Sequence, residues 1–186
     1  MAEVVEGQRT FTVDEYHRMA EAGVIGPDER VELIRGVIRQ MSPKGRRHVQ
    51  AVTLANHLFT PLLAGRAIVQ IQDPVRLPKL SSEPEPDVAV LSSSDPRDAG
   101  SRDLEVLLVV EVAETSLRFD REDKARMYAE GGVSEYWVVN LVEDVLEVFR
   151  DPQNGVYRTH LVFKPEESLS PLAFADIEVS VSDLIP

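Results

Sequence analysis

The alternation of apolar and polar positions along the chain predicts a protein rich in β-strands. Apolar runs that are typical of strands occur at 67–72, 74–78, 88–91, 106–112, 134–141, 144–150 and 157–163. The segment 31–41 has the pattern of two further short strands, joined as a hairpin at Arg35-Gly36. The strands at 144–150 and 157–163 are expected to offer free edges, which invite pairing with another chain, so a homodimer is expected.

Three helices are predicted from capping residues and from helical spacing. Thr12 and Glu15 form a capping box, which predicts a helix over about 13–22. Apolar residues recur at helical spacing over 46–63 and indicate a second helix. Asp120 is expected to cap a third helix, which runs to 129 and ends before two glycines.

The order of these elements indicates an α+β (mixed α/β) fold, in which a mixed β-sheet is flanked by helices. The 186 residues suit a single domain, 1–186, because no linker divides the chain. Within it we distinguish an N-terminal helix and hairpin (11–41), a core (46–150) and C-terminal strands (156–186).

Composition narrows the classes of function. No apolar run approaches the roughly 20 residues of a membrane helix, and the N-terminus lacks the regions of a signal peptide. The absence of cysteine excludes disulfides and thiolate metal sites, and it fits a cytoplasmic protein. The net charge of −12 argues against tight nonspecific binding of long DNA, which depends on Lys and Arg.

Two acidic residues at the ends of predicted buried strands carry the main chemical signal. Asp87 precedes the strand 88–91, and Glu111 lies near the end of 106–112. If the strands are neighbours, the two carboxylates converge and repel each other unless a cation lies between them. Mg²⁺ or Mn²⁺ suits such oxygen ligands. By spacing alone, acids at strand ends are more often loop caps or salt-bridge partners, so both interpretations stay open.

Two further residues are placed to join this predicted site. Glu32, in the early hairpin, is a candidate third acid. Lys124 lies on the helix that follows the Glu111 strand, and this helix is expected to fold back over the sheet. Its ammonium would then help to activate water or neutralise the charge that develops on a phosphate.

The motifs around these residues resemble a known family. Glu85-Pro86-Asp87-Val88-Ala89-Val90, LLVVEVAETSLRFDREDKARMYAEGGVSEYWVV and VELIRGVIRQMSP together resemble the Uma-type family of restriction endonuclease-like proteins, in the PD-(D/E)XK nuclease-like superfamily. The resemblance covers roughly residues 11–150. It implies a restriction-endonuclease-like core and Mg²⁺-dependent (or Mn²⁺-dependent) hydrolysis of phosphodiester bonds in nucleic acid, with DNA as the first expectation.

The resemblance also implies roles for single residues. Pro86-Asp87 matches the PD element, so Asp87, Glu111 and Glu32 are the implied metal ligands. The lysine that normally follows the second acid by two positions is replaced by Ala113. The resemblance therefore implies that Lys124 takes its role, which completes the catalytic group Asp87, Glu111, Lys124 and Glu32.

Weaker candidates for substrate binding come from the basic and aromatic residues. Lys44, Arg46 and Arg47 form the densest basic cluster, which is either a solvated loop or a substrate contact. His48 lies beside this cluster, and Tyr128 lies one helical turn after Lys124. Packing in the core is the competing interpretation for Tyr128.

Three functional interpretations remain open at this point. The first is a metal-dependent nuclease without any association with a membrane. The second is a catalytically silent nuclease-fold protein that acts as a homodimeric binding module, which the acidic composition and Ala113 favour. The third is a hydrolase of small nucleotides, which would tolerate the negative charge better. Charge reversal at Lys44, Arg46 and Arg47 separates the first two interpretations. It should abolish nucleic-acid binding under the first and leave the partner interface of the second unchanged.

Overall fold

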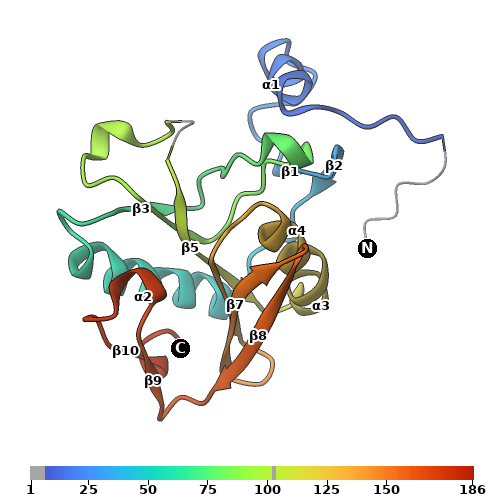
Figure 1. Ribbon diagram of the computed structural model, residues 1–186. Helices are drawn as coiled ribbons and strands as arrows, with labels where there is room; N and C mark the ends of the chain where they lie inside the picture. The colour runs from blue at the N-terminus through green and yellow to red at the C-terminus, as the bar shows by residue number, and fades with distance from the viewer. Residues whose placement is uncertain (1–6, 102–103) are drawn as a thin grey trace.

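A six-stranded mixed β-sheet forms the centre of the described part of the chain (Figure 1). The structure is a computed structural model that describes residues 7–101 and 104–186. The strands, in sheet order, are β3 (Ile68–Ile71), β4 (Val88–Leu91), β5 (Val106–Ala113), β6 (Glu135–Asn140), β7 (Val145–Gln153) and β8 (Val156–Phe163). With helices packed on both faces, this sheet confirms the α+β class expected from the sequence.

The parallel pair β5–β6 determines where the next helical segment lies. All other neighbours in this sheet pair antiparallel. Parallel strands require a crossover, which here is α3 (Leu117–Phe119), the π-helical turn η3 (Asp120–Lys124) and α4 (Ala125–Glu130). The crossover returns over one face of the sheet and carries Lys124 with it.

Helices cover the two faces of the sheet. On one face, α2 (Arg46–Leu62) shares a core with Val110 of β5 and with the C-terminal pair β9 (Ser168–Leu169) and β10 (Val179–Ser180), beside which it lies in Figure 1. On the other face, α4 shares a core with Val109. Because side chains alternate along a strand, Glu111 lies on the same face as Val109, below the crossover segment.

The N-terminal segment consists of a helix and a hairpin, as predicted. Helix α1 (Val13–Glu21) begins at the capping box, in which Thr12 Oγ1 accepts a hydrogen bond from the Glu15 N–H at 3.2 Å. The hairpin pairs β1 (Val31–Ile34) with β2 (Val37–Gln40). Its turn has positive φ at Arg35 (51°) and Gly36 (76°), which is the geometry of a tight type I′ turn.

Two expectations about strands are wrong. Residues 74–78 form no strand: an isolated bridge joins Leu77 to Ser82, and the turn η1 (Pro78–Leu80) follows. Pro74 and Pro78 have no N–H to donate to a ladder, which explains the difference. The segment 144–150 is not an edge, because β7 lies between β6 and β8, whereas β8 is an edge as expected.

The expected cap at Asp120 is also wrong. The helical segment already begins at Leu117, and Asp120 lies inside it, where its carboxylate accepts a hydrogen bond from Ser116 Oγ. The single domain predicted over 1–186 stays a prediction, and residues 1–6 and 102–103 lie outside the described residues. Within the described residues, no helix is both long enough and apolar enough to span a bilayer.

Candidate active site

A cavity of about 290 Å³ opens where five parts of the chain meet. These are the ends of β4 and β5, the beginning of α2, the hairpin β1–β2 and the segment α3–η3. Its acidic lining residues are Glu32, Glu85, Asp87, Glu111, Glu114 and Asp120. Its basic lining residues are Arg30, Arg39, Lys44, His48 and Lys124. The sheet therefore brings the acids predicted from the sequence into one charged cavity.

Asp87 is held at the cavity by three donors. Its carboxylate accepts hydrogen bonds from the Val112 N–H (2.9 Å), Gln72 Nε2 (2.9 Å) and His48 Nε2 (3.1 Å). The antiparallel register of β4 and β5, with Val88 opposite Val110, explains why Asp87 reaches this backbone. Burial acts to raise the pKa of Asp87, but the hydrogen bonds from His48, Gln72 and the backbone lower it overall. Asp87 is therefore ionised at neutral pH.

Glu111 is bound by two side chains from the crossover. Lys124 Nζ donates to Glu111 Oε1 at 2.8 Å, and the Tyr128 hydroxyl donates to the same oxygen at 3.0 Å. Lys124 and Tyr128 are four residues apart and so lie on one side of the helical segment. Lys124 Nζ also lies 3.4 Å from Glu32 Oε2. The ammonium thus lies between two carboxylates that come from different elements.

The three charges at this position perturb one another. Burial raises the pKa of Glu111 to about 8, and the nearby carboxylates of Asp120, Asp87 and Glu32 add to the rise that Lys124 opposes. For Lys124, burial acts to lower the pKa, but Glu111, Glu32 and Asp120 together raise it above its ordinary value. Lys124 therefore stays charged, and the site has more carboxylates than one ammonium neutralises.

Asp120 is a site residue that the sequence reasoning missed. It is 2% exposed, lines the cavity and begins the π-helical turn that ends at Lys124. Burial raises its pKa, against the effect of Lys124. The spacing of four residues to Lys124 was the available signal, because it places both side chains on one side of a helix.

The structure brings together some of the predicted residues and separates others. The catalytic candidates Glu32, Asp87, Glu111 and Lys124 all line the cavity, and so does His48. Of the other basic candidates, Lys44 lines the cavity, whereas Arg46 and Arg47 do not. Arg47 donates to the Leu141 carbonyl and to Asp144, so it fastens the turn between β6 and β7. Arg46 is exposed on α2 and lies outside the cavity lining.

The predicted role of Tyr128 as a substrate ligand has no support from its position. Its side chain is fully buried, its ring lies 5.0 Å from that of Tyr136, and its hydroxyl is bound to Glu111. Tyr128 therefore orients a catalytic candidate from within the core, which is nearer to the packing interpretation.

Two carboxylates of the site each have an oxygen that the contacts described above do not use. Within the described residues, no three His, Asp or Glu side chains are arranged to hold a metal ion. The hydrogen bonds of Glu111 converge on Oε1, and those of Glu32 involve Oε2. Among these contacts, Glu111 Oε2 and Glu32 Oε1 have no partner, so each carboxylate keeps one oxygen for another ligand.

Comparison with known proteins shows the family of the chain and a solved structure with a similar fold. A family model described as "Uma2: Putative restriction endonuclease" matches residues 13–182. A protein from Anabaena variabilis, whose crystal structure is described as that of "a putative nuclease belonging to DUF820", has a similar fold with a TM-score of 0.67. The two chains are 19% identical, and the similarity covers 94% of this chain and 97% of the other. A search of curated proteins found no match.

Proposed function

Because this chain belongs to the Uma2 family of "putative restriction endonuclease" proteins, we propose that it is a divalent-metal-dependent nuclease that hydrolyses phosphodiester bonds of nucleic acid. One observation carries the proposal: Glu32, Asp87, Glu111 and Lys124, from four separate segments of the chain, line the same cavity. Burying three acids and one amine together costs folding free energy. Such clusters of perturbed titratable groups are typical of sites for binding or catalysis.

The donor set fits Mg²⁺ or Mn²⁺. Mg²⁺ keeps several waters and needs only one or two protein carboxylates, so a ready cluster of three ligands is not required. Asp87 and Glu111, with Glu32 as a third acid, would hold the cation. The cation would supply a Lewis acid, which activates water and neutralises charge on the phosphate. The raised pKa of Glu111 supports this fit: it comes mainly from burial, with smaller contributions from nearby carboxylates, and an added cation would stabilise the ionised form.

The residues of the chain would prepare the reaction in distinct ways. The hydrogen bonds from His48 and Gln72 fix the orientation of Asp87 before any ligand arrives. The hydrogen bond from the buried Tyr128 hydroxyl fixes the orientation of Glu111. Lys124 would turn its ammonium from Glu111 to an oxygen of the reacting phosphate and stabilise the negative charge that develops there.

Cleavage of a labelled oligonucleotide tests the proposal. The wild-type protein should cleave it with Mg²⁺ or Mn²⁺ and should stop when EDTA is added. Asp87→Asn keeps the shape of the side chain but removes its charge, so the rate should fall by at least about 100-fold, as when an electrostatic contact to a transition state is lost. Asp176→Asn is the matched control, because Asp176 is exposed and pairs with Arg66 outside the cavity. Equal rates for Asp87→Asn and the wild type would refute the assignment.

A second candidate function is supported by the free edge of β8. This strand ends the sheet, and Val156, Leu161 and Val162 on it are exposed. A catalytically silent protein that pairs through β8 with a second copy would use this edge. Sedimentation of the wild type and of Val162→Lys distinguishes the candidates: a dimer that Val162→Lys dissociates, together with absence of cleavage in every metal, would favour the binding module.

A further inference from the structure

The hairpin β1–β2 projects a basic side chain into the cavity beside the acids. In the antiparallel register, Glu32 lies opposite Arg39, so both side chains are on the same face of the hairpin. Arg39 lines the cavity, and its guanidinium lies 3.9 Å from the centroid of the Phe119 ring. This contact joins the hairpin to α3 and holds the guanidinium in place by a cation–π interaction.

The donors of Arg39 are not used by any other described residue in this arrangement. Among the described residues, no acceptor forms a hydrogen bond or an ion pair with Arg39, whose contact is with a ring face. Other arginines of the chain have theirs in use: Arg47 donates to a carbonyl and to Asp144, and Arg121 donates to Glu143 and Glu147. A fixed planar guanidinium with free donors is suited to binding two oxygens of one phosphate.

Two further cations line the same cavity as Arg39. Arg30 donates to the Ser42 carbonyl at 3.4 Å, next to the loop that carries Lys44, and both basic residues line the cavity. Burial and the nearby Arg30 lower the pKa of Lys44, although Asp87 and Glu85 oppose this effect. Positive charge that is concentrated in this way favours an anionic ligand.

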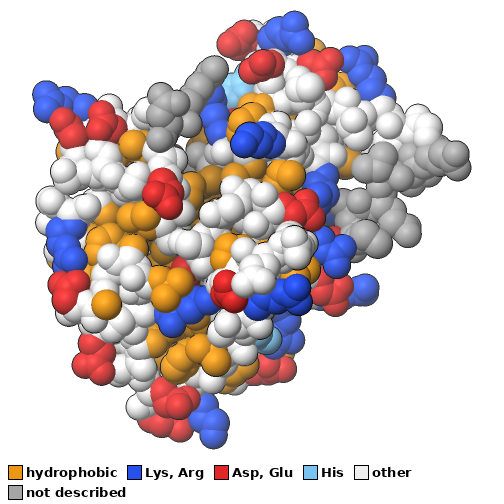
Figure 2. Space-filling view, in the orientation of Figure 1, with side chains coloured by type: hydrophobic (Ala, Val, Ile, Leu, Met, Phe, Trp, Pro, Cys, Tyr) orange, Lys and Arg blue, Asp and Glu red, His pale blue; other side chains and the backbone are white. Residues whose placement is uncertain are grey.

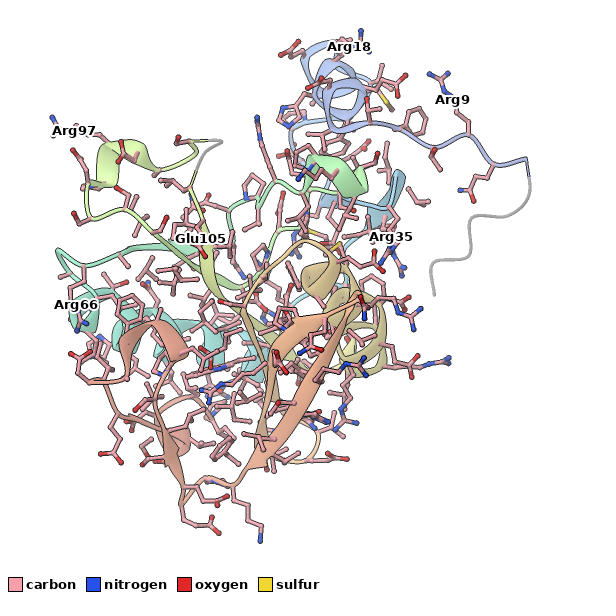
Figure 3. All side chains as sticks on the ribbon, viewed as in Figure 1. Arg9, Arg18, Arg35, Arg66, Arg97 and Glu105 are labelled. Atoms are coloured by element: carbon pink, nitrogen blue, oxygen red, sulfur yellow. The ribbon has the colours of Figure 1, made fainter. Side chains whose placement is uncertain are left out.

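We propose that Arg39, assisted by Lys44 and Arg30, forms a phosphate subsite. It binds the phosphate next to the reacting phosphodiester in the nucleic-acid strand. The proposal rests on the proposed function, because it gives the cavity two groups of side chains. The acids hold the cation, and the basic residues Arg39, Lys44 and Arg30 hold a neighbouring phosphate. On the face shown in Figure 2, Lys and Arg side chains are interspersed with Asp and Glu. Arg18 and Arg97 lie at the outer surface in Figure 3 and are not among the residues that line the cavity, so they are not part of this subsite.

The charge of the whole chain gives this subsite its importance. With a net charge of −12, the protein repels a polyanion at long range. Contacts within the cavity must therefore supply most of the affinity, and the loss of one fixed guanidinium should be easy to measure.

Binding of a fluorescein-labelled single-stranded oligodeoxynucleotide tests the subsite. Anisotropy would be measured with Ca²⁺ in place of Mg²⁺, and the oligonucleotide checked for cleavage on a gel. Arg39→Gln should raise Kd by about tenfold, the effect of losing a charge-assisted pair of hydrogen bonds. It should also reduce the salt slope by about one. Arg39→Lys keeps the charge but loses the planar fork, so its Kd should lie between the two.

The control for charge is Arg126→Gln, because Arg126 is exposed on α4 and lies outside this cavity. Its Kd should stay within about twofold of the wild-type value, as for an isolated surface charge. In cleavage assays, Arg39→Gln should raise KM and leave kcat nearly unchanged, because a neighbouring phosphate is bound equally in the ground and transition states. A merely structural role would instead lower the melting temperature and kcat together.

The outcomes separate the subsite from the nuclease. A wild type that does not bind the oligonucleotide, an Arg39→Gln variant that binds as tightly as the wild type, or an equal loss in Arg126→Gln would overturn the subsite. Binding that depends on Arg39, without cleavage in any metal, would uphold the subsite and refute the nuclease. Metal-dependent cleavage with a KM that is unchanged in Arg39→Gln would do the opposite.

Discussion

The pair Glu111–Lys124 shows how single residues set the charge of the site. Both side chains are almost completely buried, and their contact of 2.8 Å joins β5 to the crossover segment. Removing Lys124 would leave the buried carboxylates of Glu111 and Glu32 without their shared ammonium, which is strongly destabilising when they are ionised. Burial raises the pKa of Glu111 to about 8, so the ionisation of this glutamate contributes to the pH dependence of folding near neutral pH.

The stability of the metal-free protein should therefore depend on pH through Glu111. Its pKa is about 8 in the folded state and about 4.5 ordinarily, so between these values the folded state holds the extra proton. The free energy of unfolding should then fall as the pH rises through this window and level off above it. Urea denaturation across the window should show a steeper fall for the wild type than for Glu111→Gln, which has no such proton. Parallel curves would contradict the raised pKa.

At the scale of elements, the hairpin β1–β2 and the crossover segment complete the cavity. The hairpin supplies Glu32 and Arg39, and the crossover supplies Phe119, Asp120 and Lys124. Contacts between these two elements, Lys124 with Glu32 and Arg39 with Phe119, fix one to the other. The position of the hairpin is therefore expected to matter for binding as much as the identity of its side chains.

The turn of the hairpin allows this expectation to be tested. A Cβ on Gly36 would lie 2.6 Å from Thr10 Cβ and 3.1 Å from the Phe11 carbonyl oxygen, at a φ of +76°. Gly36→Ala should lower the free energy of unfolding by about 1 kcal/mol for the left-handed backbone, and by about 1–3 kcal/mol more for the crowding. It should also weaken oligonucleotide binding.

Gly23 provides the control for the backbone effect. Its φ is +71°, but a Cβ there would meet nothing within 4 Å. Gly23→Ala should therefore lose only the backbone contribution, measured by the same urea titration. If the two variants lost equal stability, crowding at Gly36 would have no role in positioning the hairpin.

The elements also show what sequence patterns can reveal. Asp87 and Glu111 could be found because each lies at the end of an apolar run, where a carboxylate is out of place. Asp120 and Arg39 could not be assigned in this way. Asp120 resembled a helix cap, because nothing in the pattern showed that the helix begins earlier. The partner of Arg39, Phe119, comes from a distant segment, and such a contact depends on tertiary packing that periodicity does not report.

For the whole molecule, the order of the sheet is the decisive feature. The antiparallel pair β4–β5 sets Asp87 beside the end of β5, and the parallel pair β5–β6 forces the crossover that covers Glu111. The pattern of apolar runs predicted the strands but not their neighbours, which depend on pairing between distant segments. The strong negative charge of the chain makes a cation in the cavity more favourable and an unassisted polyanion less so.

Anomalous diffraction from a crystal soaked in Mn²⁺ tests the central claim most directly. We expect a peak in the cavity within about 2.0–2.2 Å of carboxylate oxygens of Asp87 and Glu111, and we expect it to vanish in Asp87→Asn. A soaked crystal with no peak between these two carboxylates, or with an equal peak in Asp87→Asn, would contradict the assignment of the cavity as a metal-dependent active site.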